Sequence, residues 1–143
     1  MAITQAMSTS FKVQLLNGQQ NFSANTFKIA LYTSSATVGE NTTVYAATNE
    51  VPSTGNYSAG GNTLSVNVTP TNTGNVAFIS FANTSWANAT ITANGALIYN
   101  ANLANAAVAV LAFGGDKTST DGTFAVNFPT ADASSAIIRL TAS

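Results

Sequence analysis

The sequence predicts an all-β fold, an antiparallel β-sandwich of jelly-roll type with seven or eight short strands and one short N-terminal helix. Three observations predict it. Short apolar segments recur along the 143 residues, most of them alternate with polar residues, and Gly, Asn or Pro punctuates the gaps. No βαβ spacing occurs. A chain of this length forms one domain, here residues 10–143, which follows an N-terminal arm at residues 1–9.

The centre of the predicted sheet is the stretch Gly95 to Phe113. It holds two apolar runs, Ala96 to Tyr99 and Ala106 to Phe113, separated by a polar segment rich in Asn. Each run is too short to span a membrane and suits a pleated surface. We therefore expect two neighbouring antiparallel strands around which the rest of the chain packs.

The N-terminal part predicts an arm and then a helix. Residues 1–9 are small and polar without periodicity, so we expect an arm that is ordered when something holds it, as an extension onto a neighbour. Ser10 to Gly18 starts with Ser, carries apolar residues and ends in Asn-Gly, which favours a short helix with Gly18 in a left-handed cap. A strand through Phe11, Val13 and Leu15 is the alternative.

A half-buried strand and a long excursion follow. Thr26 to Tyr32 alternates, with one apolar face and with Lys28 and Tyr32 on the other face. Thr33 to Tyr57 is long and polar, which predicts a surface excursion with a turn of helix around Val44 to Thr48. Long excursions from a compact sheet are where partner contacts are often found.

The remaining strands read as hairpins. Thr63 to Val68 alternates and is expected to end at Pro70, and Thr73-Gly74-Asn75 turns the chain into its hairpin partner, Val76 to Phe81. Short strand segments are expected at Thr84 to Trp86 and at Thr90 to Thr92.

After the central pair, one more hairpin is expected. Gly114 to Gly122 reads as its closing loop, leading to a strand at Thr123 to Phe128. In that strand Phe124, Val126 and Phe128 point one way. Ala136 to Leu140 is the last strand.

Composition argues against catalysis and against nucleic-acid or membrane binding. The chain has no Cys and no His, which removes the thiolate, the commonest general base and the commonest metal ligand. Four scattered basic residues cannot form a phosphate-binding patch or a membrane anchor. Asn, Thr and Ser make up roughly a third of the chain, which is typical of a surface that packs against copies of itself or a large partner.

No residue pattern indicates a catalytic, cofactor or metal site. Asp116 and Asp121 flank one loop but lack the alternating acidic ligands of a calcium loop, so turn formation is the simpler interpretation. A hydrolase would have to bring together Glu50, Asp116 or Asp121 without a supporting motif. The possible partner contacts are the apolar and aromatic residues of the arm, the excursion and the strands: Ile3, Met7, Val44, Tyr45, Tyr57 and Trp86.

Several segments, in the same order along the chain, resemble a group of small virion proteins of tailed bacteriophages. They are FKVQLLNG at 11–18, TFKIALYT at 26–33, YSAGGN at 57–62 and GALIYN at 95–100, with Asn21-Phe22 and Glu50-Val51 between them. These are structural patterns, and none is a catalytic signature.

The resemblance implies a non-enzymatic capsid decoration, or cement, protein. Such a protein sits on the outside of the virion head, binds the major capsid protein, pairs with its own copies as a dimer or trimer, and is assembled in the bacterial host cytoplasm. Phage β-domains of this size also occur in tails, so the alternative is a tail or fibre module that binds a host surface glycan. A glycan binder of this kind should present Trp86 on its surface.

Overall fold

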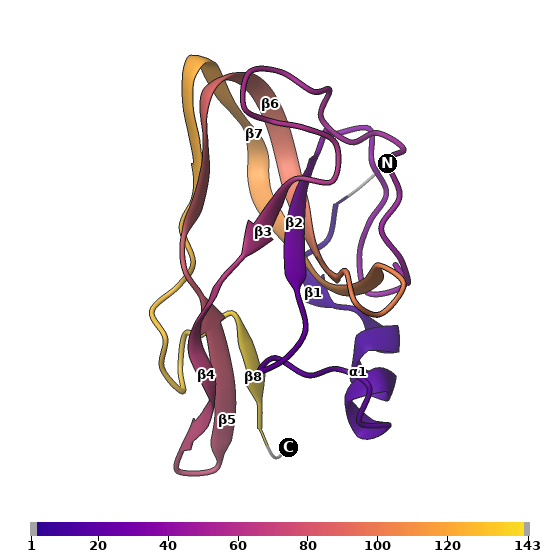
Figure 1. The fold of residues 1–143 in the computed structure, drawn as a ribbon, viewed down its shortest axis with the longest axis vertical. Helices are drawn as coiled ribbons and strands as arrows, with labels where there is room; N and C mark the ends of the chain where they lie inside the picture. Colours follow the sequence, from indigo (N-terminus) through magenta and orange to yellow (C-terminus); the bar gives the residue numbers. More distant parts are fainter. Residues whose placement is uncertain (1–2, 142–143) are drawn as a thin grey trace.

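The computed structural model describes residues 3–141 and has the predicted all-β class with one short helix (Figure 1). Its strands form two antiparallel sheets, one with the order β1-β7-β6-β2-β3 and the other with the order β4-β5-β8. The jelly-roll arrangement stays a prediction. The elements are β1 (Ala6–Met7), α1 (Thr9–Leu16), β2 (Phe27–Tyr32), β3 (Asn62–Leu64), β4 (Val66–Thr73), β5 (Val76–Phe81), β6 (Thr84–Asn100), β7 (Ala106–Val126) and β8 (Ile138–Leu140).

The predicted central pair is confirmed as the antiparallel hairpin of β6 and β7, joined by residues 101–105. These strands have 17 and 21 residues, far longer than expected. The separate segments predicted around Trp86 and Thr90 are both part of β6. The expected loop at Gly114 to Gly122 is wrong, because these residues continue β7, and Lys117, Thr118, Ser119 and Gly122 pair with β6.

Bulges explain how one strand can contain so many turn residues. Between the pairs Gly95–Ala112 and Ala93–Lys117, one residue of β6 faces four residues of β7, and Gly114 and Gly115 have positive φ there. The hairpin bends over in this region (Figure 1). Its two halves therefore fold over a common core.

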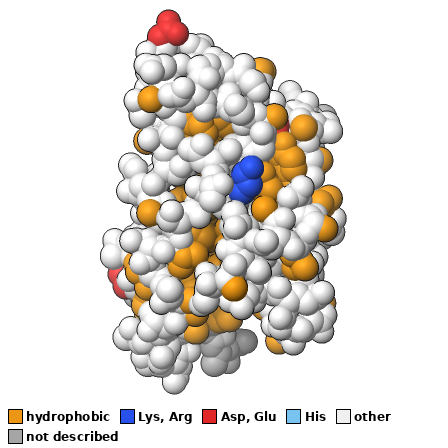
Figure 2. All heavy atoms as spheres, viewed as in Figure 1, with side chains coloured by type: hydrophobic (Ala, Val, Ile, Leu, Met, Phe, Trp, Pro, Cys, Tyr) orange, Lys and Arg blue, Asp and Glu red, His pale blue; other side chains and the backbone are white. Residues whose placement is uncertain are grey.

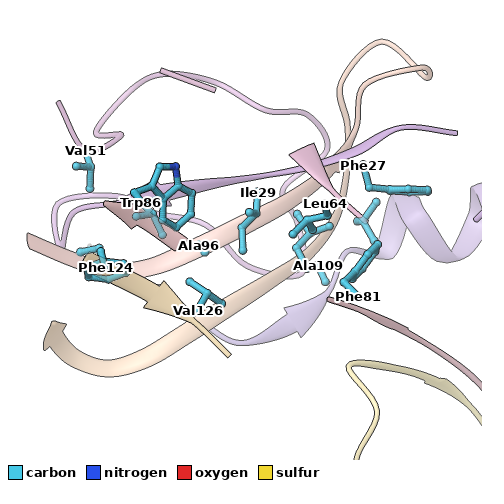
Figure 3. Close-up of a cluster of buried hydrophobic side chains, with 14 of the residues drawn as sticks. Phe27, Ile29, Val51, Leu64, Phe81, Trp86, Ala96, Ala109, Phe124 and Val126 are labelled. Carbon is cyan, nitrogen blue, oxygen red and sulfur yellow. The ribbon is translucent and has the colours of Figure 1, made fainter. Parts of the chain in front are cut away.

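The main core lies inside this bent hairpin. Residues from both halves of β6 and β7 join residues of β2 in one buried cluster, as Figure 3 shows for Trp86, Ala96, Phe124 and Ile29. The prediction that Phe124, Val126 and Phe128 point the same way is confirmed, and that way is inward, since the first two are buried and Phe128 packs against the cluster. This cluster contains most of the buried hydrophobic residues of the described chain, and removing them from water favours folding.

A second, smaller core covers the other face of the central strands. It contains Tyr32, Leu97, Tyr99 and Val110, with Ile3 packed against it. Burial on both faces explains why the two central runs are continuously apolar. Tyr32 was expected on an open polar face and is only 1% exposed, because the chain after β2 packs over it.

The hairpin prediction for β4 and β5 is confirmed, with Gly74 at positive φ in the connection. The predicted strand Thr63 to Val68 is instead split: β3 belongs to the larger sheet and β4 to the smaller one. Pro70 does not end β4. It is tolerated because β4 is an edge strand and its register shifts between Val68 and Thr71.

The N-terminal segment is held by its own domain. Ala6 and Met7 pair with Val110 and Ala109 of β7, and the amide N–H of Ser8 donates to the carbonyl of Val108 at 2.9 Å. Met1 and Ala2 lie outside the described residues. In the rest of the expected arm, Ala6 and Met7 form β1 of the sheet and Thr9 already begins α1. The helix ends at Leu16, and Gly18 beyond it has the predicted left-handed conformation.

Candidate functional site

The strongest candidate for a functional surface is the excursion after β2, residues 33–57, called here the surface loop. Its returning part is tied to its first residue and to β2: the amide N–H of Thr33 donates to the carbonyl of Asn49 at 3.0 Å, and that of Val51 donates to the carbonyl of Leu31 in β2 at 2.9 Å. The Tyr32 hydroxyl donates to the carbonyl of Ala46 at 2.6 Å. The last part of the surface loop therefore lies beside the end of β2, where the loop begins.

The middle of the surface loop is docked along the start of β7. The amide N–H of Tyr45 donates to the carbonyl of Asn105 at 2.9 Å, and that of Ala107 donates to the carbonyl of Thr43 at 3.0 Å. Val44 forms an isolated antiparallel bridge with Ala106. The helical turn predicted at Val44 to Thr48 is therefore wrong, because these residues extend an edge of the sheet.

Glu50 is the centre of the hydrogen bonds that brace this loop. Its carboxylate accepts from the Tyr45 hydroxyl at 2.6 Å, from the Tyr57 hydroxyl at 2.7 Å and from the amide N–H of Gly60 at 2.7 Å. The Tyr57 hydroxyl also accepts from the amide N–H of Leu31 at 2.9 Å. The carboxylate thus joins the surface loop to the segment after it through charge-assisted hydrogen bonds, and the Tyr57 hydroxyl links them to β2.

Tyr99 completes this arrangement from β6. Its ring stacks on that of Tyr45 with centroids 4.7 Å apart, and its hydroxyl donates to the carbonyl of Gly60 at 2.6 Å. We call Glu50, Tyr45, Tyr57, Tyr99 and Gly60 the Glu50 cluster. It fixes the surface loop to the centre of the sheet.

The tyrosines of the Glu50 cluster stay protonated in the folded chain. Burial, followed by the hydrogen bond to Glu50, raises the pKa of both Tyr45 and Tyr57 above the ordinary value of 10.0. Burial and the nearby charge of Glu50 also raise the pKa of Tyr99 and of Tyr32. Neutral phenols are poor bases and nucleophiles, so the cluster is chemically suited to bracing.

The three carboxylates considered for a hydrolase each bond to different partners. Glu50 accepts from the groups just described, Asp116 accepts from the Asn94 side chain at 3.0 Å, and Asp121 accepts from the Thr90 hydroxyl at 3.4 Å. Each acid holds a loop or bulge to a neighbouring segment. Among the described residues, no group of three His, Cys, Asp or Glu side chains could hold a metal ion.

The structure separates the predicted partner contacts into exposed and buried ones. Val44 is 47% exposed on the surface loop, and Tyr45 is half-buried beside it. Trp86 and Tyr57 are each 1% exposed, which corrects their interpretation as partner contacts: their rings pack together in the core with centroids 5.4 Å apart. The indole N–H of Trp86 finds no acceptor among the described residues.

The two contacts predicted on the N-terminal arm face the domain itself. Ile3 packs against the smaller core and Met7 against the main core. An ideal Cβ on Gly95 would lie 2.5 Å from the Leu111 carbonyl oxygen and 2.6 Å from Ile3 Cγ2, so a larger residue there would displace the backbone of β7 as well as Ile3. A role for these side chains in reaching a neighbour is therefore corrected to a role in packing.

Sequence reasoning missed the part played by Glu50. Its hydrogen-bonding partners are brought together by the fold from the surface loop and the segment after it, and Tyr99 is added from β6, so no local spacing marks the cluster. The available signal was weak: an acidic residue next to the apolar Val51 in a chain with few charges.

No protein-family model, curated protein or solved structure matches this chain. Within residues 3–141, no helix is both long and apolar enough to span a membrane.

Proposed function

We propose that this chain is a non-enzymatic structural protein of a tailed-bacteriophage virion. It decorates the outside of the head as a cement protein and bridges subunits of the major capsid protein. Assembly takes place in the bacterial host cytoplasm. The resemblance of several segments to small phage virion proteins supports this proposal, and so does the all-β fold.

The observation that carries the proposal is the braced surface loop. A loop that is already fixed loses little conformational entropy when it binds, so more of its contact energy appears as affinity. Residues 43, 44 and 46–49 of this loop are exposed, and none of them is charged. This part of the loop, which does not include the exposed Glu40, is therefore suited to repeated neutral contacts with a large protein surface.

The wider surface fits the same role. Only 6% of the residues are charged, and on the face shown in Figure 2 charged side chains are few. Contacts made by uncharged polar and small apolar groups depend little on salt. When they are repeated around a symmetric shell, weak contacts of this kind stabilise the assembled lattice by mass action and avidity.

The test is co-sedimentation of the purified chain with phage heads that lack it. Saturable binding, with heads that then resist heat better, is the expected result. Whole tailed particles serve as a comparison. Binding at the tail and none at the head would overturn the proposal and favour the tail module.

A matched pair of variants tests the surface loop itself. Val44→Asp should weaken head binding about tenfold, because it places a charge in the contact area. Leu16→Asp, at a 90% exposed leucine on α1, changes a comparable apolar side chain away from the loop and should leave binding intact. Loss of binding in the Leu16 variant alone would move the contact from the loop to α1. Circular dichroism checks that both variants fold.

A further inference from the structure

The outer edge of β7 is open over its second half. β6 pairs along one side of β7, whereas the other side is covered only at its start, by Val44 of the surface loop at Ala106 and by β1 at Val110 and Ala109. The Gln5 side-chain oxygen then accepts from the amide N–H of Ala112 at 3.3 Å. Beyond Ala112, no strand of residues 3–141 pairs with this edge. An unpaired strand edge is a template for another strand.

An apolar groove of about 500 Å³ runs beside this open edge. Among the residues that line it are Leu111, Phe113, Phe124, Val126, Phe128 and Ile137. The groove lies where the two halves of β7 face each other, with the rings of Phe113 and Phe124 at a centroid distance of 6.2 Å. An edge with free amides beside an apolar groove is the arrangement to which an added strand binds.

The amide directions in the second half of β7 follow from one hydrogen bond. The amide N–H of Phe128 donates to the side-chain oxygen of Asn83 at 2.7 Å, next to the start of β6. Because amide directions alternate along an extended chain, those of Ala125 and Asn127 point to the open edge. The side chains of Ala125 and Asn127 are exposed on the outer face, while Val126 is buried.

We propose that a second copy of this chain occupies the edge, pairing residues 123–127 of its own β7 antiparallel with the same residues of the first copy. A two-fold axis then passes beside Ala125, and Thr123 of each copy lies opposite Asn127 of the other. Phe124 lies opposite Val126 of the second copy, an aromatic pair with a β-branched residue that favours strand pairing. The segment is self-complementary, since polar residues meet polar ones, apolar residues meet apolar ones and no charge faces a like charge.

Pairing of this kind is isologous and produces a closed dimer. The grooves of the two copies meet at the axis, so each covers apolar surface of the other. The inference deepens the proposed function, in which the chain pairs with its own copies. Its test needs no phage head, so the two proposals can fail separately.

Cysteine cross-linking tests the register. The chain has no cysteine, so Ala125→Cys introduces a single thiol. Directly opposite residues of antiparallel strands have Cα atoms about 4.5–5.5 Å apart, within the range that a disulfide spans. Mild oxidation should convert this variant to a covalent dimer on a non-reducing gel. The control is Ala101→Cys, at an exposed alanine in the turn between β6 and β7, which should stay monomeric.

Sedimentation velocity tests the association without a cross-link. The wild-type chain should show a concentration-dependent dimer, and Ala125→Lys, which places two like charges opposite each other at the axis, should weaken it about tenfold. An equimolar mixture of Ala125→Lys and Ala125→Asp should restore the dimer, because opposite charges then face each other. A wild-type chain that stays monomeric, or equal cross-linking of the two cysteine variants, would overturn the inference. If the chain is monomeric but Ala125→Lys loses head binding, the edge belongs to a capsid-protein strand instead.

Discussion

At the scale of the residue, the chain concentrates its tyrosines around one acid. Tyr45 and Tyr57 donate to Glu50, and Tyr99 stacks on Tyr45. The phenols provide donors that remain protonated, and the carboxylate provides acceptors that several donors can share. This arrangement lets a domain with few charges fix a long loop without ion pairs of long side chains, which contribute little at a surface.

The substitution Glu50→Gln tests this brace. The side-chain amide of the variant offers N–H groups where the carboxylate accepted, so at least one of the Tyr45, Tyr57 and Gly60 donors loses its acceptor. We expect the free energy of unfolding, measured by urea denaturation, to fall by about 2 kcal/mol. Glu40→Gln is the matched control, because the Glu40 side chain is exposed. The hydrogen bond from the amide N–H of Thr9 goes to the backbone carbonyl of Glu40, so the substitution leaves it in place. Equal free energies of unfolding for the two variants would show that the hydrogen bonds to Glu50 do not stabilise the fold.

Alkaline pH tests the tyrosines around Glu50 by removing their protons. The unfolded chain loses tyrosine protons near pH 10, whereas the raised pKa values of Tyr32 and Tyr57 keep these residues protonated in the folded state. Stability from this source is present below about pH 10 and is lost as the pH rises toward the folded-state values, by up to about 1.4 kcal/mol per pH unit for each buried tyrosine.

Urea denaturation between pH 8 and pH 11.5, with tyrosine ionisation followed by absorbance, measures this loss. Ionisation should coincide with unfolding. Tyr57→Phe removes one titrating group, so its stability should fall less steeply with pH, relative to its own value at pH 8. Phenols that ionise near pH 10 while the chain stays folded would contradict the prediction.

At the scale of the element, the sequence identifies the strands better than their connections. The central pair and the β4–β5 hairpin follow from apolar patterns and turn residues. The continuation of β7 through Gly114 to Gly122 does not, because a turn and a bulge both use residues that accept positive φ, such as Gly114, Gly115 and Asp121. Whether the chain keeps pairing across such residues depends on the partner strand, which local sequence does not specify.

The sheet change between β3 and β4 and the Glu50 cluster were unpredictable for a related reason. Leu64 and Val66 continue one alternating pattern, yet they belong to strands of different sheets. Alternation specifies which face is buried and carries no information on which strand lies alongside. In the Glu50 cluster, likewise, the contact between Tyr45 and Tyr99 depends on where β6 lies in the sheet, which the local sequence does not specify.

Gly61 and Gly74 form a matched pair for testing how a strand connection constrains the sheet. Both have positive φ, but an ideal Cβ on Gly61 would lie 1.7 Å from the Ile29 carbonyl oxygen, whereas one on Gly74 would meet nothing within 4 Å. Gly74→Ala should cost about 1 kcal/mol from backbone strain alone. Gly61→Ala should cost about 2 kcal/mol more, because β2 must shift. Urea denaturation of both variants measures the difference, and equal losses would show that the close approach to Ile29 is relieved without cost.

At the scale of the whole molecule, the fold buries most of its aromatic residues and leaves a surface with few charges. The central strands are covered on both faces, by the bent hairpin on one side and by the surface loop with the N-terminal segment on the other. A partner would therefore meet exposed loop residues and strand edges, because the core side chains are buried. The proposed capsid contact and the proposed self-association would therefore use different parts of the domain.

The single tryptophan reports on this organisation and separates the decoration proposal from the glycan-binding alternative. Trp86 lies in the core beside Tyr57 and Phe124, so its fluorescence should be blue-shifted relative to the unfolded chain and poorly quenched by iodide. Adding host polysaccharide should leave the emission unchanged, because a sugar cannot stack on a buried ring. The urea-unfolded chain, in which iodide should quench strongly, is the control. A saturable shift with polysaccharide in the folded chain would mean that the core opens to a ligand, and the tail module would then become the better account.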